Sequence, residues 1–213
     1  MNKYSFSWAR FSEVPIIGIV RNISLATIKQ IMPLYKEAGL TSIEITMNTM
    51  GAADIIHFVR RNYPGLNVGA GTVCTEKDLI KALHAGAQFI VTPVTDKKII
   101  HACVKEKLPV FPGAFTPTEI YKAWTLGASM VKLYPAKTLG PGYIKDIKAP
   151  FNQIKLLPTG GIGLDDIASF RQAGADGFGI GSPLFNAALI QEENWPLLLD
   201  HFKRFVSKAQ VTP

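Results

Sequence analysis

Short apolar runs alternate with amphipathic stretches along the whole chain. The runs with the length and β-branched content of strands are residues 15–20, 42–47, 67–73, 89–94, 109–114, 130–135, 154–161 and 177–184. Between them, 75–86, 116–127 and 163–174 have helical spacing and end in glycine, and the first two open with a threonine that can cap a helix. Apolar strands separated by helices are typical of a parallel sheet with covered faces. The pattern predicts an α/β protein, specifically a (β/α)8 TIM barrel rather than an open doubly wound sheet.

A repeated feature supports this prediction. Gly39, Gly86, Gly127 and Gly174 each end a predicted helix just before a predicted strand. Their spacing fits two βα units, because a single βαβ crossover takes about 30 residues or more. The same signals occur in open sheets, so closure of the barrel is a separate inference.

The chain is long enough to bury one large core. It has 213 residues, 47% of them hydrophobic, and no tract that resembles a linker. We expect residues 1–213 to form one domain, with an N-terminal helix or extension at 1–14 and a C-terminal helix at 194–213. No apolar stretch has the length of a secretory signal or a membrane span. The chain has two cysteines, too few for a disulfide-rich secreted scaffold, and the expected location is therefore the cytoplasm.

The net charge of +7 favours an anionic partner. Basic residues are spread along the chain without a run interleaved with aromatic residues, so we expect neither nucleic acid nor a membrane as partner. No cofactor is expected, because Gly69 and Gly71 lack the third glycine of a dinucleotide-binding fingerprint. The histidines and cysteines lack the spacing of metal ligands, so no metal site is expected.

Polar residues stand inside or at the ends of predicted strands, where barrel enzymes place their catalytic groups. Lys132 lies within the apolar run 130–135, where burial disfavours an ammonium group and produces the free amine of a nucleophile. The alternative is an edge strand with this lysine in solvent. Glu44, Thr46 and Asn48 alternate along one run, so we expect all three to point to one side.

Three further residues extend this polar set. Arg21 follows the first strand and could grip a carboxylate in two places, or it could simply lie in solvent. A lysine, a carboxylate and an arginine inside one barrel would form a satisfied polar network. Within it, Glu44 either pairs with Lys132 or shuttles protons beside it. Thr72 and Thr159 could line a pocket or serve packing alone.

Two glycine-rich segments, 158–166 and 179–185, follow the seventh and eighth strands. Barrels often bind phosphate there through backbone N–H groups and a short helix. The alternative is a pair of tight turns that need glycine for their conformation. Their position on adjacent strands favours phosphate.

Several motifs, in order and in spacing, resemble those of one enzyme family. They are IEIT, GAGTV, VTP, FPGAFTPTE, VKLYPA, GPGYIKDIKAPF and LPTGGI, and the match runs from about Pro15 to Phe185. The chain resembles the 2-keto-3-deoxy-6-phosphogluconate (KDPG) aldolases, whose family includes 4-hydroxy-2-oxoglutarate aldolases and enzymes for the galactonate epimer. The resemblance implies a (β/α)8 barrel with an N-terminal helix across its base, assembled as a homotrimer. It also implies class I, metal-independent cleavage of a phosphorylated keto acid to pyruvate and glyceraldehyde 3-phosphate.

The resemblance also implies roles for individual residues. Lys132 would be the Schiff-base lysine and Glu44 the general acid and base. The remaining pocket and phosphate contacts would come from Thr72, Pro93, Thr159, Gly160, Gly161, Gly181 and Ser182.

One position departs from part of the family. Some members have an arginine where this chain has Asn48, and use it on the pyruvate carboxylate. This chain resembles a second pattern, in which an arginine at the end of the first strand, here Arg21, supplies that grip. Asn48 would then contact a substrate hydroxyl or water, which leaves the preferred epimer open.

Two other functions fit the same residues. A sugar-phosphate isomerase or epimerase would use the phosphate loops without a covalent intermediate, and Lys132 would act only through its charge. A non-catalytic sugar-phosphate-binding protein would keep the pocket alone. The pairing of Lys132 with Glu44 argues against the non-catalytic protein, and we expect the aldolase ahead of both alternatives.

Overall fold

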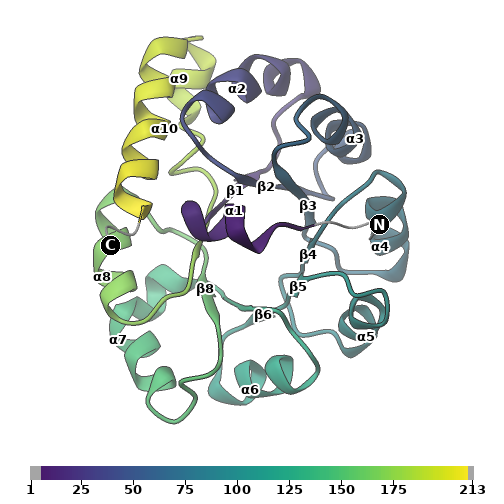
Figure 1. Ribbon diagram of the computed structural model, residues 1–213, viewed down its shortest axis with the longest axis vertical. Helices are drawn as coiled ribbons and strands as arrows, with labels where there is room; N and C mark the ends of the chain where they lie inside the picture. Colours follow the sequence, from purple (N-terminus) through teal and green to yellow (C-terminus); the bar gives the residue numbers. More distant parts are fainter. Residues whose placement is uncertain (1–5, 211–213) are drawn as a thin grey trace.

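The apolar runs form parallel β-strands, and the amphipathic stretches form helices that surround them (Figure 1). The computed structural model describes residues 6–210. The strands are β1 (Ile16–Val20), β2 (Ser42–Thr46), β3 (Asn67–Gly71), β4 (Ile90–Val91), β5 (Val110–Phe111), β6 (Gly113–Ala114), β7 (Val131–Leu133), β8 (Leu156–Pro158) and β9 (Phe178–Ile180). The helices are α1 (Trp8–Glu13), α2 (Leu25–Glu37), α3 (Ala52–Asn62), α4 (Glu76–His84), α5 (Lys97–Lys105), α6 (Pro117–Thr125), α7 (Ala136–Lys148), the 3-10 helix η1 (Leu164–Asp166), α8 (Ile167–Gln172), α9 (Ala187–Gln191) and α10 (Trp195–Ala209).

The strands form a curled parallel arrangement in two hydrogen-bonded sheets. One sheet has the order β5-β4-β3-β2-β1-β9 and the other has the order β6-β7-β8. The α/β class and the parallel sheet are therefore confirmed, whereas these ladders do not show an unbroken (β/α)8 barrel.

The sheets are divided at two seams. The run predicted as a single strand at 109–114 is split at Pro112, which has no N–H to donate to a ladder. At the other seam, a single bridge joins Thr159 and Gly179.

The strand residues are buried on both faces, and the helices cover them from outside. The expected threonine N-caps are present: Thr75 accepts a hydrogen bond from the Asp78 N–H, and Thr116 forms a capping box with Glu119. The predicted helix-ending glycines at 39, 86, 127 and 174 all have positive φ, between 90° and 104°. Local sequence signals therefore set where several helices begin and end.

Helix α1 closes the end of the molecule at which the strands begin (Figure 1). Asn67, the first residue of β3, accepts a hydrogen bond from the Ser7 N–H at 2.8 Å and donates one to the Ser7 carbonyl at 3.0 Å. Phe6 packs its ring edge-on against Phe89 and Phe111. Since aromatic side chains fill this end, an open site is left for the opposite end, where the strands finish.

The expected terminal helices are present over the described residues. The expected N-terminal element at 1–14 corresponds to α1, and residues 1–5 lie outside the described part. The expected C-terminal helix at 194–213 corresponds to α10, and residues 211–213 lie outside it. Between residues 6 and 210, no helix is both long enough and apolar enough to cross a membrane.

Candidate active site

A cavity of about 660 Å³ opens where β1, β7, β8 and β9 end. It lies at the end of the strands opposite to α1. The predicted site residues that line it are Arg21, Lys132, Thr159, Gly160, Gly161, Gly181 and Ser182. The sequence therefore identified much of this wall in advance. It did not identify the side of the cavity formed by Asn22, Ser24 and Thr27, or Ile190 and Gln191 of α9.

Lys132 lines this cavity and is buried, with only 4% of its surface exposed. It lies in β7, paired with Gly113 on one side and Leu157 on the other, so the edge-strand alternative is wrong. Burial lowers the pKa of Lys132 below its ordinary value; Glu44 opposes this shift, and the Arg21 cation adds to it. These effects favour the free amine.

Glu44 is a buried carboxylate, 1% exposed, in β2. Burial raises the pKa of Glu44 above its ordinary value, while the Lys132 and Arg21 cations act in the opposite direction. Its Oε1 has no hydrogen-bond partner among the described residues. The expected satisfied network is therefore incomplete, because charges interact across the site while one carboxylate oxygen has nothing to accept from.

Gly71 gives the Glu44 carboxylate its room. A Cβ atom at residue 71 would lie 1.6 Å from Glu44 Oε1. The carboxylate thus occupies space that any other residue at this position would fill. The two glycines that fail as a dinucleotide fingerprint have steric roles instead, since a Cβ at Gly69 would meet the Phe89 ring at 2.5 Å.

Arg21 is exposed, and it faces the cavity at the end of β1. Its Nη2 donates a long hydrogen bond of 3.5 Å to Thr72 Oγ1. The next residue is fixed by the neighbouring loop, because the Asn22 N–H donates to Thr49 Oγ1 at 3.0 Å. Thr49 and Thr46 share a hydroxyl–hydroxyl bond of 2.9 Å. The backbone next to Arg21 is therefore held in place by the end of β2 and the turn that follows it.

Asn48, which the sequence places on one side with Glu44 and Thr46, does not line the cavity, and neither do those two residues. Strand β2 ends at Thr46, and the Thr49 N–H then donates to the Thr46 carbonyl at 2.9 Å in a tight turn. Alternation of side chains holds only while the backbone stays extended. Asn48 lies beyond that limit and is exposed.

Pro93 and Thr72 lie around the site without lining the cavity itself. A Cβ at Gly113 would lie 2.2 Å from the Pro93 carbonyl oxygen, so the backbone of Pro93 packs directly on β6 beside the lysine strand. Thr72 adopts a left-handed conformation with φ of 53° and contacts Arg21. Both residues therefore support neighbours of Lys132.

The glycine-rich segments meet at one side of the cavity. Gly160 and Gly161 have consecutive positive φ values of 96° and 77°, which directs the backbone into a tight loop after β8. Gly181 and Ser182 follow β9 and line the same space. Three glycines and one serine thus line the same cavity, a composition typical of sites that bind anions through backbone N–H groups.

Two charged residues that contact this loop were not predicted from the sequence. Lys137 and Asp166 form an ion pair with a shortest distance of 2.6 Å. The spacing of Asp166 three residues after Gly163 is a helix-start signal that could have identified the acid. No local signal identifies its lysine partner. Among residues 6–210, no group of three or more His, Cys, Asp or Glu side chains is arranged to hold a metal ion.

Comparison with known proteins assigns the chain to an aldolase family. The model of the KDPG and KHG aldolase family matches residues 8–199, and the chain belongs to that family.

Curated relatives match most of the chain. The 2-dehydro-3-deoxy-phosphogluconate aldolase of Haemophilus influenzae is 36% identical over 84% of this chain and 86% of its own length. The 2-dehydro-3-deoxy-6-phosphogalactonate aldolase of Escherichia coli is 31% identical over 83% of this chain and 87% of its own. A solved native KDPGal structure superposes with a TM-score of 0.85 at 29% identity, covering 92% of this chain and 94% of that one.

Proposed function

We propose that the chain is a class I aldolase that cleaves 2-keto-3-deoxy-6-phosphogluconate, or its galactonate epimer, through an imine on Lys132. The products are pyruvate and glyceraldehyde 3-phosphate. The observation that carries the proposal is a lysine, 4% exposed and with lowered pKa, that lines a cavity together with an arginine and two glycine-rich loops. Membership of the aldolase family supports it.

The chemistry starts at the Lys132 amine, which attacks the C2 carbonyl of the substrate. The carbinolamine that forms loses water to give a protonated imine. When the C4 hydroxyl gives up its proton, the C3–C4 bond breaks and its electron pair moves toward the imine nitrogen. The aldehyde leaves, and the remaining enamine takes a proton at C3. Water then hydrolyses the imine, which releases pyruvate and restores the amine.

Glu44 is the group suited to move these protons. Its pKa is raised by burial, so the carboxyl can hold and release a proton closer to neutral pH. Its Oε1 accepts no hydrogen bond from the described residues. Because Glu44 does not line the cavity, a bridging water connects it to the substrate. Glu44 therefore serves carbinolamine dehydration, C4-hydroxyl deprotonation and enamine protonation in turn.

Substrate binding divides between the two ends of the ligand. Arg21 binds the carboxylate next to C2, where a guanidinium can donate two parallel hydrogen bonds. Gly160, Gly161 and Gly181 bind the phosphate through backbone N–H groups, joined by the Ser182 hydroxyl. Thr159 and Pro93 shape the pocket around Lys132, and Thr72 holds Arg21. The contact of Asn48 with a substrate hydroxyl or water stays a prediction.

The finer architecture is part of the same proposal. We infer that the strands close as one (β/α)8 barrel in a single domain, because Pro112 alone separates β5 from β6 and a bridge joins Thr159 to Gly179. By family resemblance, we propose a homotrimer located in the cytoplasm. Light scattering coupled to size-exclusion chromatography tests the trimer directly, and a monomeric or dimeric mass contradicts it.

Trapping of the imine tests the function. Pyruvate with borohydride should inactivate the enzyme and add one reduced pyruvate adduct, and peptide mapping should place the adduct on Lys132. Lys132→Met should fold, since it removes a costly buried cation, but should neither trap pyruvate nor cleave substrate. Lys145→Met is the matched control, because Lys145 is an exposed lysine of α7 that does not line the cavity.

Two results would overturn the assignment. A folded Lys132→Met variant that still turns over substrate ends the imine mechanism and favours an isomerase without a covalent intermediate. Activity that disappears with a chelator and returns with a divalent ion ends the metal-independent class.

A further inference from the structure

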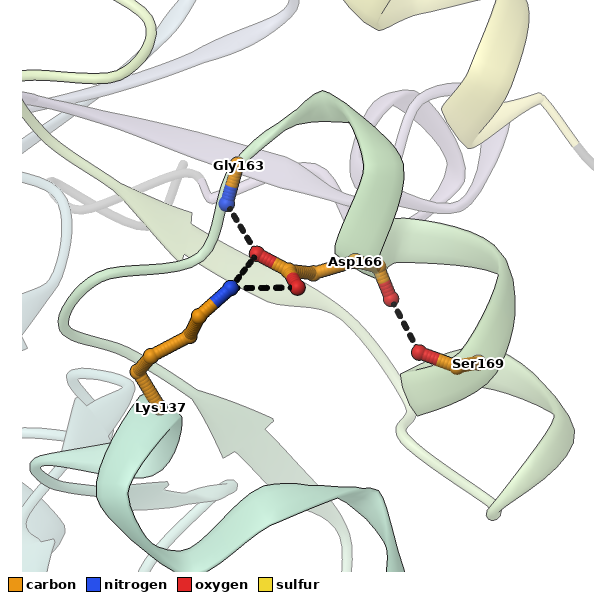
Figure 2. A network of polar contacts seen from close by, with 4 residues as sticks. All are labelled: Lys137, Gly163, Asp166 and Ser169. Carbon is orange, nitrogen blue, oxygen red and sulfur yellow. Dashed lines mark hydrogen bonds and ion pairs between the residues drawn. The ribbon is translucent and has the colours of Figure 1, made fainter.

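An ion pair joins Lys137 of α7 to Asp166 of η1, on either side of the glycine-rich loop in sequence (Figure 2). Lys137 Nζ donates to both carboxylate oxygens of Asp166, at 2.6 and 2.7 Å. The Asp166 carboxylate also accepts the Gly163 N–H at 2.8 Å, and the Ser169 hydroxyl donates to the Asp166 carbonyl at 2.9 Å. Partial burial acts to raise the pKa of Asp166, but the hydrogen bonds from Lys137 and Gly163 outweigh it and lower that pKa, so the carboxylate is charged at neutral pH.

The lysine belongs to α7, and the first turn of α7 supports the loop directly. The Ala136 N–H donates to the Thr159 carbonyl at 2.8 Å, and the Lys137 N–H donates to the Gly160 carbonyl at 3.1 Å. A Cβ at Gly161 would lie 2.7 Å from Lys137 Cβ, so this glycine packs against the lysine stem. The loop is thus attached to α7 at its start, and the ion pair with Asp166 attaches it at its end.

The elements joined in this way carry the two halves of the proposed site. Strand β7, which holds Lys132, leads directly into α7. The loop that α7 supports presents Gly160 and Gly161 to the cavity, whereas Lys137 and Asp166 do not line it. The ion pair therefore contacts the loop without lining the cavity.

We infer that Lys137 and Asp166 are positioning residues that fix the phosphate-binding loop relative to Lys132, and so set the distance between the imine and the phosphate. This inference rests on the proposed function. Lys137 also neutralises a carboxylate that would otherwise stand unpaired behind a site for a dianion. The ion pair is named the loop clamp below.

The chain offers a matched control at the other end of the same elements. Lys148, near the end of α7, donates to Asp176 Oδ2 at 2.7 Å and to the Ile154 carbonyl at 2.8 Å. The Asp176 carboxylate also accepts the N–H of Leu156, the first residue of β8, at 2.8 Å. This pair, like the loop clamp, joins a lysine of α7 to an aspartate. It contacts the start of β8, whereas the loop clamp contacts the loop that follows the end of β8.

The test compares phosphorylated and unphosphorylated substrates. Lys137→Met keeps the stem that packs on Gly161 and removes the charge. It should raise KM for the phosphorylated keto acid about tenfold with a small change in kcat, because a shifted loop misplaces its N–H donors. For 4-hydroxy-2-oxoglutarate, which has no phosphate, kcat/KM should change by less than about twofold.

Three further variants separate positioning from other roles. Asp166→Asn keeps an oxygen for the Gly163 N–H but loses the ion pair, and should raise the same KM. Lys137→Arg can still bind the carboxylate and should restore most of the affinity. Lys148→Met, the control, should lower Tm while leaving both values of KM near those of the parent.

Some outcomes overturn the inference. If Asp166→Asn leaves phosphorylated-substrate KM unchanged or lowers it while Lys137→Met raises it, Lys137 is itself a phosphate ligand. If kcat/KM falls equally for both substrates in Lys137→Met, or if Lys148→Met produces the same pattern as Lys137→Met, the effect is a general loosening of the fold.

Inorganic phosphate separates this inference from the proposed function. It should raise the Tm of the parent protein and do so less in Lys137→Met, whether or not pyruvate can be trapped on Lys132. Failure of trapping with this phosphate effect intact rejects the aldolase mechanism and keeps the clamp. Successful trapping with equal phosphate effects in both proteins rejects the clamp and keeps the mechanism.

Discussion

Gly71→Ala offers a test of how closely the Glu44 carboxylate must be placed. The added methyl would stand 1.6 Å from Glu44 Oε1 and 2.2 Å from its carboxyl carbon, whereas ordinary contacts begin at 3.4 Å. The carboxylate must therefore move by about 1.8 Å, because the methyl is fixed to a central strand. Gly71 has an ordinary negative φ, so alanine itself introduces no backbone strain there.

The expected loss follows from that displacement. A misplacement of about 1 Å in a catalytic group costs on the order of 10²-fold in rate, so kcat should fall by at least about that factor. Overpacking of a filled interior should lower the free energy of unfolding by about 1–3 kcal/mol. Pyruvate trapping on Lys132 should persist at a reduced rate, because the amine remains in place.

A coupled assay for released pyruvate measures kcat, and chemical denaturation measures stability. Gly69→Ala is the matched control, being the same change in the same strand. Its methyl would meet the Phe89 ring at 2.5 Å, at the end closed by α1, and not the carboxylate. It should destabilise the fold by a similar amount and leave kcat much closer to that of the parent.

A double mutant sharpens the argument. In a Glu44→Ala background there is no carboxylate to displace, so adding Gly71→Ala should slow the enzyme no further. A folded Gly71→Ala variant with parental kcat would show that Glu44 tolerates the displacement. Rate losses of Gly71→Ala and Glu44→Ala that multiply would show that Gly71 acts independently of Glu44.

Two further predictions concern charge at the site. Arg21→Ala should weaken binding of the substrate carboxylate by about 1.5–3 kcal/mol. It should also raise the pH midpoint for pyruvate trapping, because the Arg21 cation helps to lower the pKa of Lys132. Arg21→Lys should keep that midpoint but restore only part of the affinity, and an unchanged KM in both variants would show that another group binds the carboxylate. The folded-state pKa of Lys132 lies below its ordinary 10.5, so the unfolded chain binds more protons between these values and the lysine costs stability below 10.5. Lys132→Met should therefore raise the free energy of unfolding most at acidic pH, by an amount that shrinks as pH approaches 10.5; denaturation across pH checks this, and a constant difference contradicts it.

Much of the site was accessible from sequence because burial leaves a clear signal. A charged residue in an apolar run of strand length, such as Lys132 or Glu44, is costly unless it has a function, and both are buried as predicted. The glycine-rich end of β8 was equally readable, because the positive φ values of Gly160 and Gly161 restrict the residue type there. These signals are local, and each depends on a few neighbouring residues.

The remaining features depend on tertiary structure. The expectation for Asn48 extended the alternation of side chains past Thr46, where a hydrogen-bonded turn ends the strand. Lys137 looks like an ordinary solvated lysine at the start of a helix, and its partner Asp166 is far away in sequence. The seam at Pro112 had a visible signal, since proline interrupts a ladder, but its effect on the sheet depends on which strands pair on either side.

The acid–base properties of the site have a single physical origin. In water a glutamic acid and a lysine have well-separated pKa values, 4.5 and 10.5 here, so a proton moves between them only at a large cost. Removal of water disfavours both charged forms, which raises the pKa of Glu44 and lowers that of Lys132. The two values move toward each other, and a proton relay works best when donor and acceptor are closely matched. Arg21 lowers both pKa values together, so its charge shifts the pH at which the pair works without separating the pair. Burial by the surrounding apolar strands is therefore what makes a lysine and a glutamate usable as nucleophile and proton shuttle near neutral pH.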